Sequence, residues 1–221
     1  MIISLKHRFI FIKGVKVGGT SIETHLSNVL EEDAVIAKVP GDLFPSHKHR
    51  NYLSPDGTAQ FIDHMSATAV RSVIGTWLYE RLYKFGVIRN PFEKIISLFA
   101  MHHFDNPSYT LDKAIAECES EKTLLCDGDS MIVHRAIFYE SLNAQLKEVL
   151  DQLGVPFSGN LTYNERSESR QKLKNLEFHL SPIQIQEILE KFKFEFDLYA
   201  AADRRIVTPE PGVKKIGSNK Y

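Results

Sequence analysis

The sequence contains few of the features that place a protein in a specialised class. Only two of its 221 residues are cysteines, Cys118 and Cys126. Two cysteines are too few for a disulfide framework, and these two lack the paired spacing of a zinc site. We therefore expect both to be free thiols, as is typical of proteins in a reducing compartment.

Long hydrophobic runs and an excess of one charge are also missing. The N-terminal segment MIISLKHRFIFIKG has two apolar stretches separated by Lys6, His7 and Arg8, and both are too short for a signal peptide core or a membrane span. We expect a soluble cytoplasmic protein with no stable membrane insertion. The formal net charge of −1 gives no general attraction to nucleic acid, so we expect no nucleic-acid partner and only a local anion site.

Metal-ligand spacing is absent too, and the acidic run Glu31-Glu32-Asp33 is more simply a solvated loop. We expect no metal. With 43% hydrophobic residues the chain can bury a sizeable core. We predict one domain over residues 1–206, followed by a flexible C-terminal tail over residues 207–221.

What the chain does contain is an alternation of strand and helix patterns. Residues 9–12 and 83–89 are short apolar runs typical of parallel strands that are buried on both faces. Apolar residues recur at helical spacing over residues 67–82, 92–103 and 185–196. This alternation predicts an α/β fold with a P-loop-like central parallel β-sheet flanked by helices on both faces. Ligands bind such sheets beyond the carboxyl ends of the strands.

The first strand runs into a glycine-rich turn. Residues 14–21, GVKVGGTS, fit the nucleotide-binding frame G-x-x-x-x-G-K-[ST], except that Thr20 stands where the lysine is required. The lysine within this turn is Lys16 instead. The amides of residues 17–21 can surround an anion at the start of the following helix, and Gly18 and Gly19 permit its close approach. A structural turn that merely needs positive φ is the alternative.

The second strand ends in an arginine. Arg89 is a planar cation with several donors at the strand end, and Ser97 faces the same side of the following helix one to two turns later. Pro91 suits the first turn of that helix. Taken alone, the segment would be only a strand exit followed by a helix start.

Both segments resemble motifs of the sulfotransferases. KGVKVGGTS is similar to their 5′-phosphosulfate loop H-I-P-K-[TS]-[AG]-G-T-S and departs from it at Lys13, Gly14 and Val15. FGVIRNPFEKIISLF resembles their 3′-phosphate segment V-x-R-[DN]-P-[YFW]-[DE]-[RK]-x-x-S. The resemblance extends more weakly over residues 7–199 and is to the carbohydrate-type branch with its soluble bacterial relatives.

The resemblance implies a donor and a reaction. The donor would be 3′-phosphoadenosine 5′-phosphosulfate, bound by Lys16, Val17, Gly18, Gly19, Thr20, Ser21, Arg89 and Ser97. Its sulfuryl group would move to a hydroxyl or amine of a carbohydrate or glycoconjugate acceptor. Lys16 would stabilise the charge that develops on the bridging oxygen as adenosine 3′,5′-bisphosphate leaves. The alternatives are a P-loop kinase using ATP, against which Thr20 argues, and a non-catalytic nucleotide- or glycan-binding module.

His64 is the candidate general base, because imidazole is the side chain best matched to accept a proton near neutral pH. It precedes a predicted helix with Ser66 as its cap, follows the long irregular segment over residues 40–60, and matches the histidine in the family-like DHMSA segment. His47 and His49 are the competing candidates, whereas His25 and His103 are expected to have packing roles. Arg166 and Arg170 suit either a basic loop over the nucleotide or a solvated polar loop.

Overall fold

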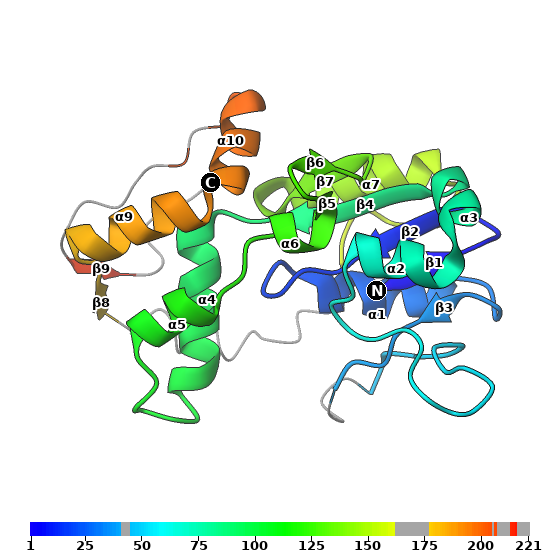
Figure 1. Cartoon of the computed structure of the whole chain (residues 1–221), viewed down its shortest axis with the longest axis horizontal. Helices are drawn as coiled ribbons and strands as arrows, with labels where there is room; N and C mark the ends of the chain where they lie inside the picture. The colour runs from blue at the N-terminus through cyan, green and yellow to red at the C-terminus, as the bar shows by residue number, and fades with distance from the viewer. Residues whose placement is uncertain (41–44, 162–176, 205, 207–212, 216–221) are drawn as a thin grey trace. The chain divides into compact units, whose positions relative to one another are not determined.

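The computed structural model describes residues 1–40, 45–161, 177–204, 206 and 213–215 (Figure 1). The chain divides into two compact units. The first unit comprises Met1–Ile88 and Glu121–Glu165, and the second comprises Arg89–Ser120 and Arg166–Tyr221. The tail proposed for residues 207–221 lies outside the described residues except for Val213–Lys215.

The first unit contains a mixed sheet in the strand order β3-β1-β2-β4-β7. Its strands are β1 (Ile2–Ser4), β2 (Phe9–Ile12), β3 (Val35–Ile36), β4 (Tyr83–Ile88) and β7 (Arg135–Phe138). Strands β2, β4 and β7 are parallel to one another, whereas β1 is antiparallel to both β2 and β3.

The prediction of a purely parallel sheet was therefore wrong at one edge. Residues 5–8 connect β1 to β2, and Arg8 in this turn has φ 57°. A connection this short can join only antiparallel strands, because parallel neighbours need a crossover of a dozen residues or more.

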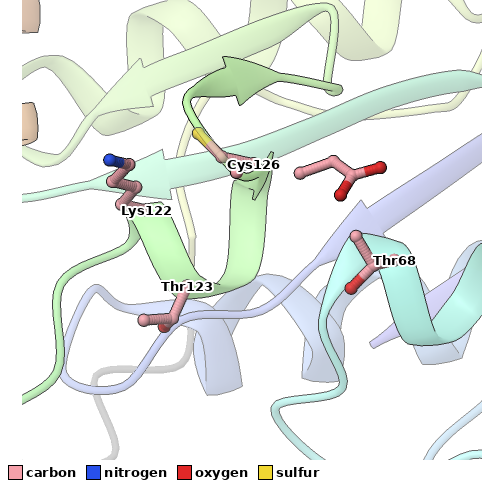
Figure 2. Close-up of a pocket in the computed structure, with 6 residues that line it drawn as sticks. Thr68, Lys122, Thr123 and Cys126 are labelled. Carbon is pink, nitrogen blue, oxygen red and sulfur yellow. The ribbon is translucent and has the colours of Figure 1, made fainter.

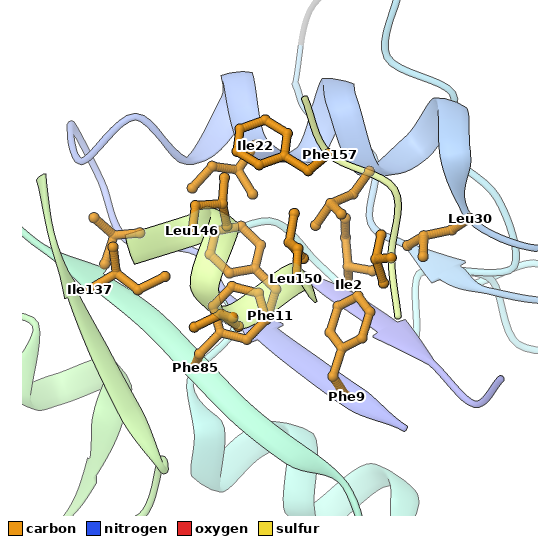
Figure 3. Close-up of a cluster of buried hydrophobic side chains, with 14 of the residues drawn as sticks. Ile2, Phe9, Phe11, Ile22, Leu30, Phe85, Ile137, Leu146, Leu150 and Phe157 are labelled. Atoms are coloured by element: carbon orange, nitrogen blue, oxygen red, sulfur yellow. The ribbon is translucent and has the colours of Figure 1, made fainter. Parts of the chain in front are cut away.

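Aromatic side chains form the centre of the first unit. Phe9, Phe11 and Phe85 point to one face of the sheet, and the rings of Phe11 and Phe85 lie 5.1 Å apart (Figure 3). This face is covered by α1 (Gly19–Val29) and α7 (Leu142–Gln152). Their buried contributions include Ile22, Leu26, Leu146 and Leu150. The continuous apolar run that predicted β2 is thus explained by burial.

The opposite face of β4 packs against a short helix, α6 (Lys122–Leu125). A Cβ atom on Gly86 would lie only 2.6 Å from Leu125 Cδ2, so this helix approaches the strand at a glycine. On the same face, Lys84 Nζ donates to the backbone oxygen of Tyr79 in α3 (Thr76–Arg81). Helices therefore cover both faces of β4.

The helix predicted over residues 67–82 is two helices. α2 (Ala67–Ile74) begins as expected, because the Ser66 hydroxyl accepts a hydrogen bond of 3.2 Å from the amide of Ala69. It ends at Gly75, whose φ of 82° is incompatible with a right-handed helix. α3 follows directly, so the apolar periodicity continues although the helix does not.

The second unit is mainly helical. Its elements are α4 (Pro91–His103), α5 (Leu111–Glu117), α9 (Pro182–Lys191), α10 (Lys193–Ala201) and the antiparallel pair β8 (Glu177–His179) and β9 (Val213–Lys215). The last predicted helix is divided at Phe192, which has ψ 25° and packs its side chain into the core of this unit. Across the described parts of both units, no helix combines the length and apolar character needed to cross a bilayer.

The remaining elements of the first unit are small. A 3-10 turn, η1 (Tyr139–Ser141), links β7 to α7, and strands β5 (Cys126–Asp127) and β6 (Ser130–Met131) form a separate hairpin. Cys118 and Cys126 are buried free thiols, as predicted.

Candidate functional site

The glycine-rich segment joins β2 to α1 through residues 13–18, which we call the glycine loop. Gly18 is the N-cap of α1 and has φ 80°, and a Cβ atom there would lie 3.0 Å from the ring of Tyr139. Lys16 has φ 60°, a conformation that costs energy for any residue except glycine. The side chain of Val17 is completely buried. The loop is therefore anchored from below while its backbone keeps an unusual conformation.

The start of α1 has the properties of an anion site. The first amides of any helix have no intrahelical partner, and here they belong to Gly19, Thr20 and Ser21. The first turn contains no acidic residue, so no side chain of that turn neutralises the partial positive charge at the start of the helix. Thr20 and Ser21 are half-buried, which leaves part of each side chain accessible.

Lys13, which in the sequence is only a departure from the sulfotransferase motif, has its side chain buried at the start of the glycine loop. Lys13 Nζ is 2.8 Å from Glu23 Oε2 and 2.8 Å from Asp63 Oδ1, and its side chain is 2% exposed. Its aliphatic stem fills the space below Gly19, where a Cβ atom would lie 2.5 Å from Lys13 Cγ. The sequence feature that could have predicted this buried lysine is its position directly after the continuous apolar run of residues 9–12.

Glu23 on α1 completes what we call the buried charge cluster, formed by Lys13, Glu23 and Asp63. Glu23 is fully buried and also contacts the N-terminal ammonium of Met1. Burial alone would raise the pKa of Glu23, but the Met1 ammonium and Lys13 together lower it well below its ordinary value. Glu23 therefore stays ionised, and two carboxylates surround the Lys13 ammonium.

His64 lies beside this cluster. Its Nδ1 is 3.2 Å from the backbone oxygen of Lys13, and its Nε2 is 3.3 Å from Asp63 Oδ2. Both neighbours can only accept, so either ring nitrogen can donate the one proton of the neutral ring, and both donate in the imidazolium. The side chain is 35% exposed, and His64 has φ 55°, like Lys16 in the left-handed region.

The protonation of His64 suits a proton acceptor. Burial lowers its pKa below the ordinary histidine value, and Lys13 lowers it further, whereas Asp63 opposes both. The ring is therefore neutral near pH 7. A neutral imidazole can take a proton from a hydroxyl placed against the exposed part of the ring, and the side chain is 35% exposed.

The other histidines have different surroundings. His47 is buried, with Nε2 3.7 Å from Glu23 Oε2, and its ring stacks on the exposed His49. His25 bonds to the backbone oxygen of Pro156, and His103 bonds to that of Tyr109. His25 and His103 also contact the rings of Phe157 and Phe99 respectively. Their predicted packing roles are confirmed.

Arg89 and Ser97 belong to the second unit. Arg89 is 14% exposed and lies 3.7 Å from Glu93 one helical turn ahead. Asn90 caps α4 through a 3.0 Å bond from the amide of Phe92, and Pro91 occupies the first turn as predicted. Ser97 is half-buried and follows Glu93 by four residues, on the same side of α4. Arg166 and Arg170 lie outside the described residues.

An open cavity of about 340 Å³ lies between α2 and the α6–β5 segment (Figure 2). It is lined by Thr68, Lys122, Thr123, Cys126, Asp127 and Gly128. Thr68 follows His64 by four residues, and Lys122 follows Glu121, whose Oε1 would lie 3.0 Å from a Cβ atom on Gly14. Thr68 and Thr123 are not recognisable as site residues in the sequence, because hydroxyls on segments far apart in the chain form no motif.

Comparisons of the chain with known protein families, with curated proteins and with solved structures found no match.

Proposed function

We propose that this chain is a sulfotransferase that uses 3′-phosphoadenosine 5′-phosphosulfate and sulfates a hydroxyl or amine of a carbohydrate or glycoconjugate. One observation carries the proposal. The candidate base, His64, hydrogen-bonds to the backbone of Lys13, the first residue of the glycine loop. The candidate anion-binding turn and the candidate proton acceptor lie fifty residues apart in the sequence but in direct contact in the structure.

The glycine loop would bind the 5′-phosphosulfate of the donor. Its fit to an anion is supported by the uncapped amides at the start of α1 and by the left-handed conformations of Lys16 and Gly18. The ammonium of Lys16 would stabilise the negative charge on the bridging oxygen, where charge grows as the sulfur departs. On the sequence resemblance alone, Arg89 and Ser97 would bind the 3′-phosphate.

In the proposed reaction, a residue of this chain, His64, takes part in a proton transfer. The acceptor oxygen attacks sulfur, and the bond from sulfur to the bridging oxygen breaks with its electron pair on the bisphosphate. The His64 imidazole takes the acceptor's proton. An unaided sugar hydroxyl is a poor nucleophile, so this step would account for an imidazole beside the loop.

A P-loop kinase is the main alternative. Such an enzyme needs a lysine beside the Ser/Thr at the start of the helix to reach the β- and γ-phosphates, and Thr20 occupies that position. Lys13 cannot substitute for it, because the buried charge cluster engages its ammonium. This arrangement favours a ligand with a single phosphosulfate over a nucleoside triphosphate.

The cavity lined by Thr68 and Thr123 is where we propose that a hydroxylated acceptor binds, because Thr68 lies on α2, which begins three residues after His64. Its volume of about 340 Å³ falls within the ordinary range of small-molecule sites. Threonine hydroxyls can both donate and accept hydrogen bonds, as the hydroxyls of a sugar require.

Isothermal titration calorimetry of the whole chain with adenosine 3′,5′-bisphosphate, and in parallel with ATP, tests the proposal. We expect binding of the bisphosphate and none of ATP. Lys147→Ala is the matched control, because Lys147 is an exposed lysine paired with Asp151 on α7, and it should leave the affinity unchanged. Binding of ATP alone would favour the kinase, and binding of neither would contradict the proposed donor.

A further inference from the structure

We propose that Asp63 is a positioning residue for His64: it fixes the ring beside the glycine loop and stabilises its protonated form, and Lys13 limits this effect by sharing the same carboxylate. The inference rests on the proposed function only for the role of His64 as the base. The contacts that carry it are within the first unit.

The carboxylate of Asp63 makes four short contacts. Oδ1 accepts a 3.1 Å hydrogen bond from the backbone amide of His64 and lies 2.8 Å from Lys13 Nζ. Oδ2 lies 3.1 Å from the same ammonium and 3.3 Å from His64 Nε2. The side chain is only 9% exposed, so water screens these contacts weakly. Asp63 thus restrains both the backbone and the ring of His64.

Both nitrogens of the His64 ring face an acceptor. Nδ1 faces the backbone oxygen of Lys13, and Nε2 faces Asp63 Oδ2. Only the imidazolium has two N–H groups, so this environment satisfies the protonated ring better than the neutral one. The protonated ring is the form produced when His64 takes a proton from an acceptor. Asp63 therefore favours the product of the proton transfer, whereas burial and Lys13 oppose that effect.

The groups around His64 shift its pKa in opposite directions. Burial, Lys13 and the Met1 ammonium all lower the pKa of His64, and Asp63 raises it. Glu23 pairs with Lys13, and His47 faces Glu23 at 3.7 Å. Asp63 is the carboxylate in contact with the ring, whereas Glu23 reaches it only through Lys13.

Lys13 connects this arrangement to the loop. Its stem supports Gly19 from below, its ammonium binds Asp63, and its backbone oxygen accepts from His64. The pair could serve stability alone, since buried ion pairs often do no more than satisfy each other. The two explanations predict different signs for the response of His64.

The test is an NMR titration of the His64 imidazole in the whole chain, with its resonance assigned from the signal lost in His64→Gln. Asp63→Asn keeps the shape and the oxygen acceptor but removes the charge, and we expect the His64 pKa to fall by about one to two pH units. Lys13→Gln removes the opposing charge, and we expect the pKa to rise. Asp151→Asn, which breaks the exposed pair with Lys147, is the control and should leave the His64 pKa unchanged.

A purely structural pair gives another pattern. Loosening the segment would hydrate the ring, and both variants would then move its pKa upward toward the ordinary value of about 6.5. An upward shift or no shift in Asp63→Asn overturns the inference. If Asp63→Asn does not fold, the wild-type chain decides, because the ¹⁵N shifts of the protonated ring must show a hydrogen-bonded Nε2–H, as the contact with Asp63 Oδ2 requires. An Nε2–H without a hydrogen bond would overturn the inference.

These outcomes are separable from the proposed function. Failure to bind adenosine 3′,5′-bisphosphate would contradict the donor without affecting the titration. Opposite pKa shifts in Asp63→Asn and Lys13→Gln would support the coupling whatever the ligand. If both variants shift the His64 pKa in the same direction while the chain binds the bisphosphate normally, Asp63 is not a positioning residue and the donor assignment stands.

Discussion

Lys13 and Asp63 form a buried ion pair across fifty residues of sequence, with Nζ of Lys13 2.8 Å from Oδ1 of Asp63. The pair connects the strand end that begins the glycine loop to the segment that carries His64. Because His64 also bonds to the backbone oxygen of Lys13, one residue positions both the candidate anion site and the candidate base.

Lys16→Ala should leave the affinity for adenosine 3′,5′-bisphosphate nearly unchanged and lower turnover by ~10²-fold or more, since the ammonium matters most in the transition state. Calorimetry measures the first quantity. Release of bisphosphate from the sulfated donor, with a panel of sugars as acceptors, measures the second. Lys147→Ala serves as the control. Weakened binding with normal turnover would remove Lys16 from this role.

Arg89→Ala should weaken the binding of adenosine 3′,5′-bisphosphate by ~2–4 kcal/mol, because the guanidinium can form charge-assisted bonds to the 3′-phosphate. The binding of AMP, which lacks the 3′-phosphate, should barely change. Calorimetry with both ligands checks this. Arg135→Ala, at an arginine that is 42% exposed, should change neither affinity. Equal weakening of the two ligands would make Arg89 a structural residue.

His64→Ala should keep the bisphosphate affinity and lower kcat by ~10²–10⁴-fold. The base is active when neutral, so turnover of the wild-type chain should rise with pH through the pKa of His64. Burial lowers that pKa, which places the midpoint of the acidic limb below about 6.5. The limb should disappear in the variant. An unchanged limb with near-normal turnover would transfer the role to His47, to His49 or to a carboxylate.

Gly18→Ala should destabilise the chain more than Gly57→Ala does. Both glycines have similar positive φ values, 80° and 83°, but a Cβ atom on Gly18 would lie 3.0 Å from Tyr139 and one on Gly57 would meet nothing within 4 Å. The conformation alone costs ~1–2 kcal/mol at each site, and overpacking adds about 1–3 kcal/mol at Gly18. Urea denaturation measures the difference. Equal losses would show that the loop tolerates the contact with Tyr139.

Glu23→Gln should lower the free energy of unfolding at pH 7 by roughly 3–5 kcal/mol, because it leaves buried cations without one of their carboxylates. The folded-state pKa of Glu23 lies below its unfolded value of 4.5, so its stabilisation is present above that pH and is lost as the pH falls. The gap between wild type and variant should therefore narrow below pH 4.5. Glu148→Gln, at a side chain that is 66% exposed, should have little effect at any pH. A gap independent of pH would mean that Glu23 contributes through its shape.

Much of the local structure could be predicted from the sequence because its causes are local. The buried strands β2 and β4 follow from continuous apolar runs, and the start of α2 follows from Ser66 as its cap. The start of α4 follows in the same way from Asn90 and Pro91. The position of the glycine loop between a strand and a helix has the same origin, since the signals lie within a few residues of one another.

The helix breaks were less predictable. Gly75 ends α2 although the apolar spacing runs on into α3, and Phe192 separates α9 from α10. Apolar periodicity predicts which side chains are buried, but it does not reveal a single residue that leaves the helical conformation. The antiparallel β1 was missed for a related reason, because pairing direction depends on the length of the connection over residues 5–8.

The sequence by itself determined where this protein could bind an anion, because a strand, two glycines and a helix start are contiguous in the chain. Only the tertiary structure decided what lies around that turn. It brought Asp63 and His64 to Lys13 at the end of β2, and it placed Thr68 and Thr123 in the lining of one cavity. Asp63 and His64 lie about fifty positions from Lys13, within the crossover from β2 to the parallel strand β4, and no local pattern encodes such contacts.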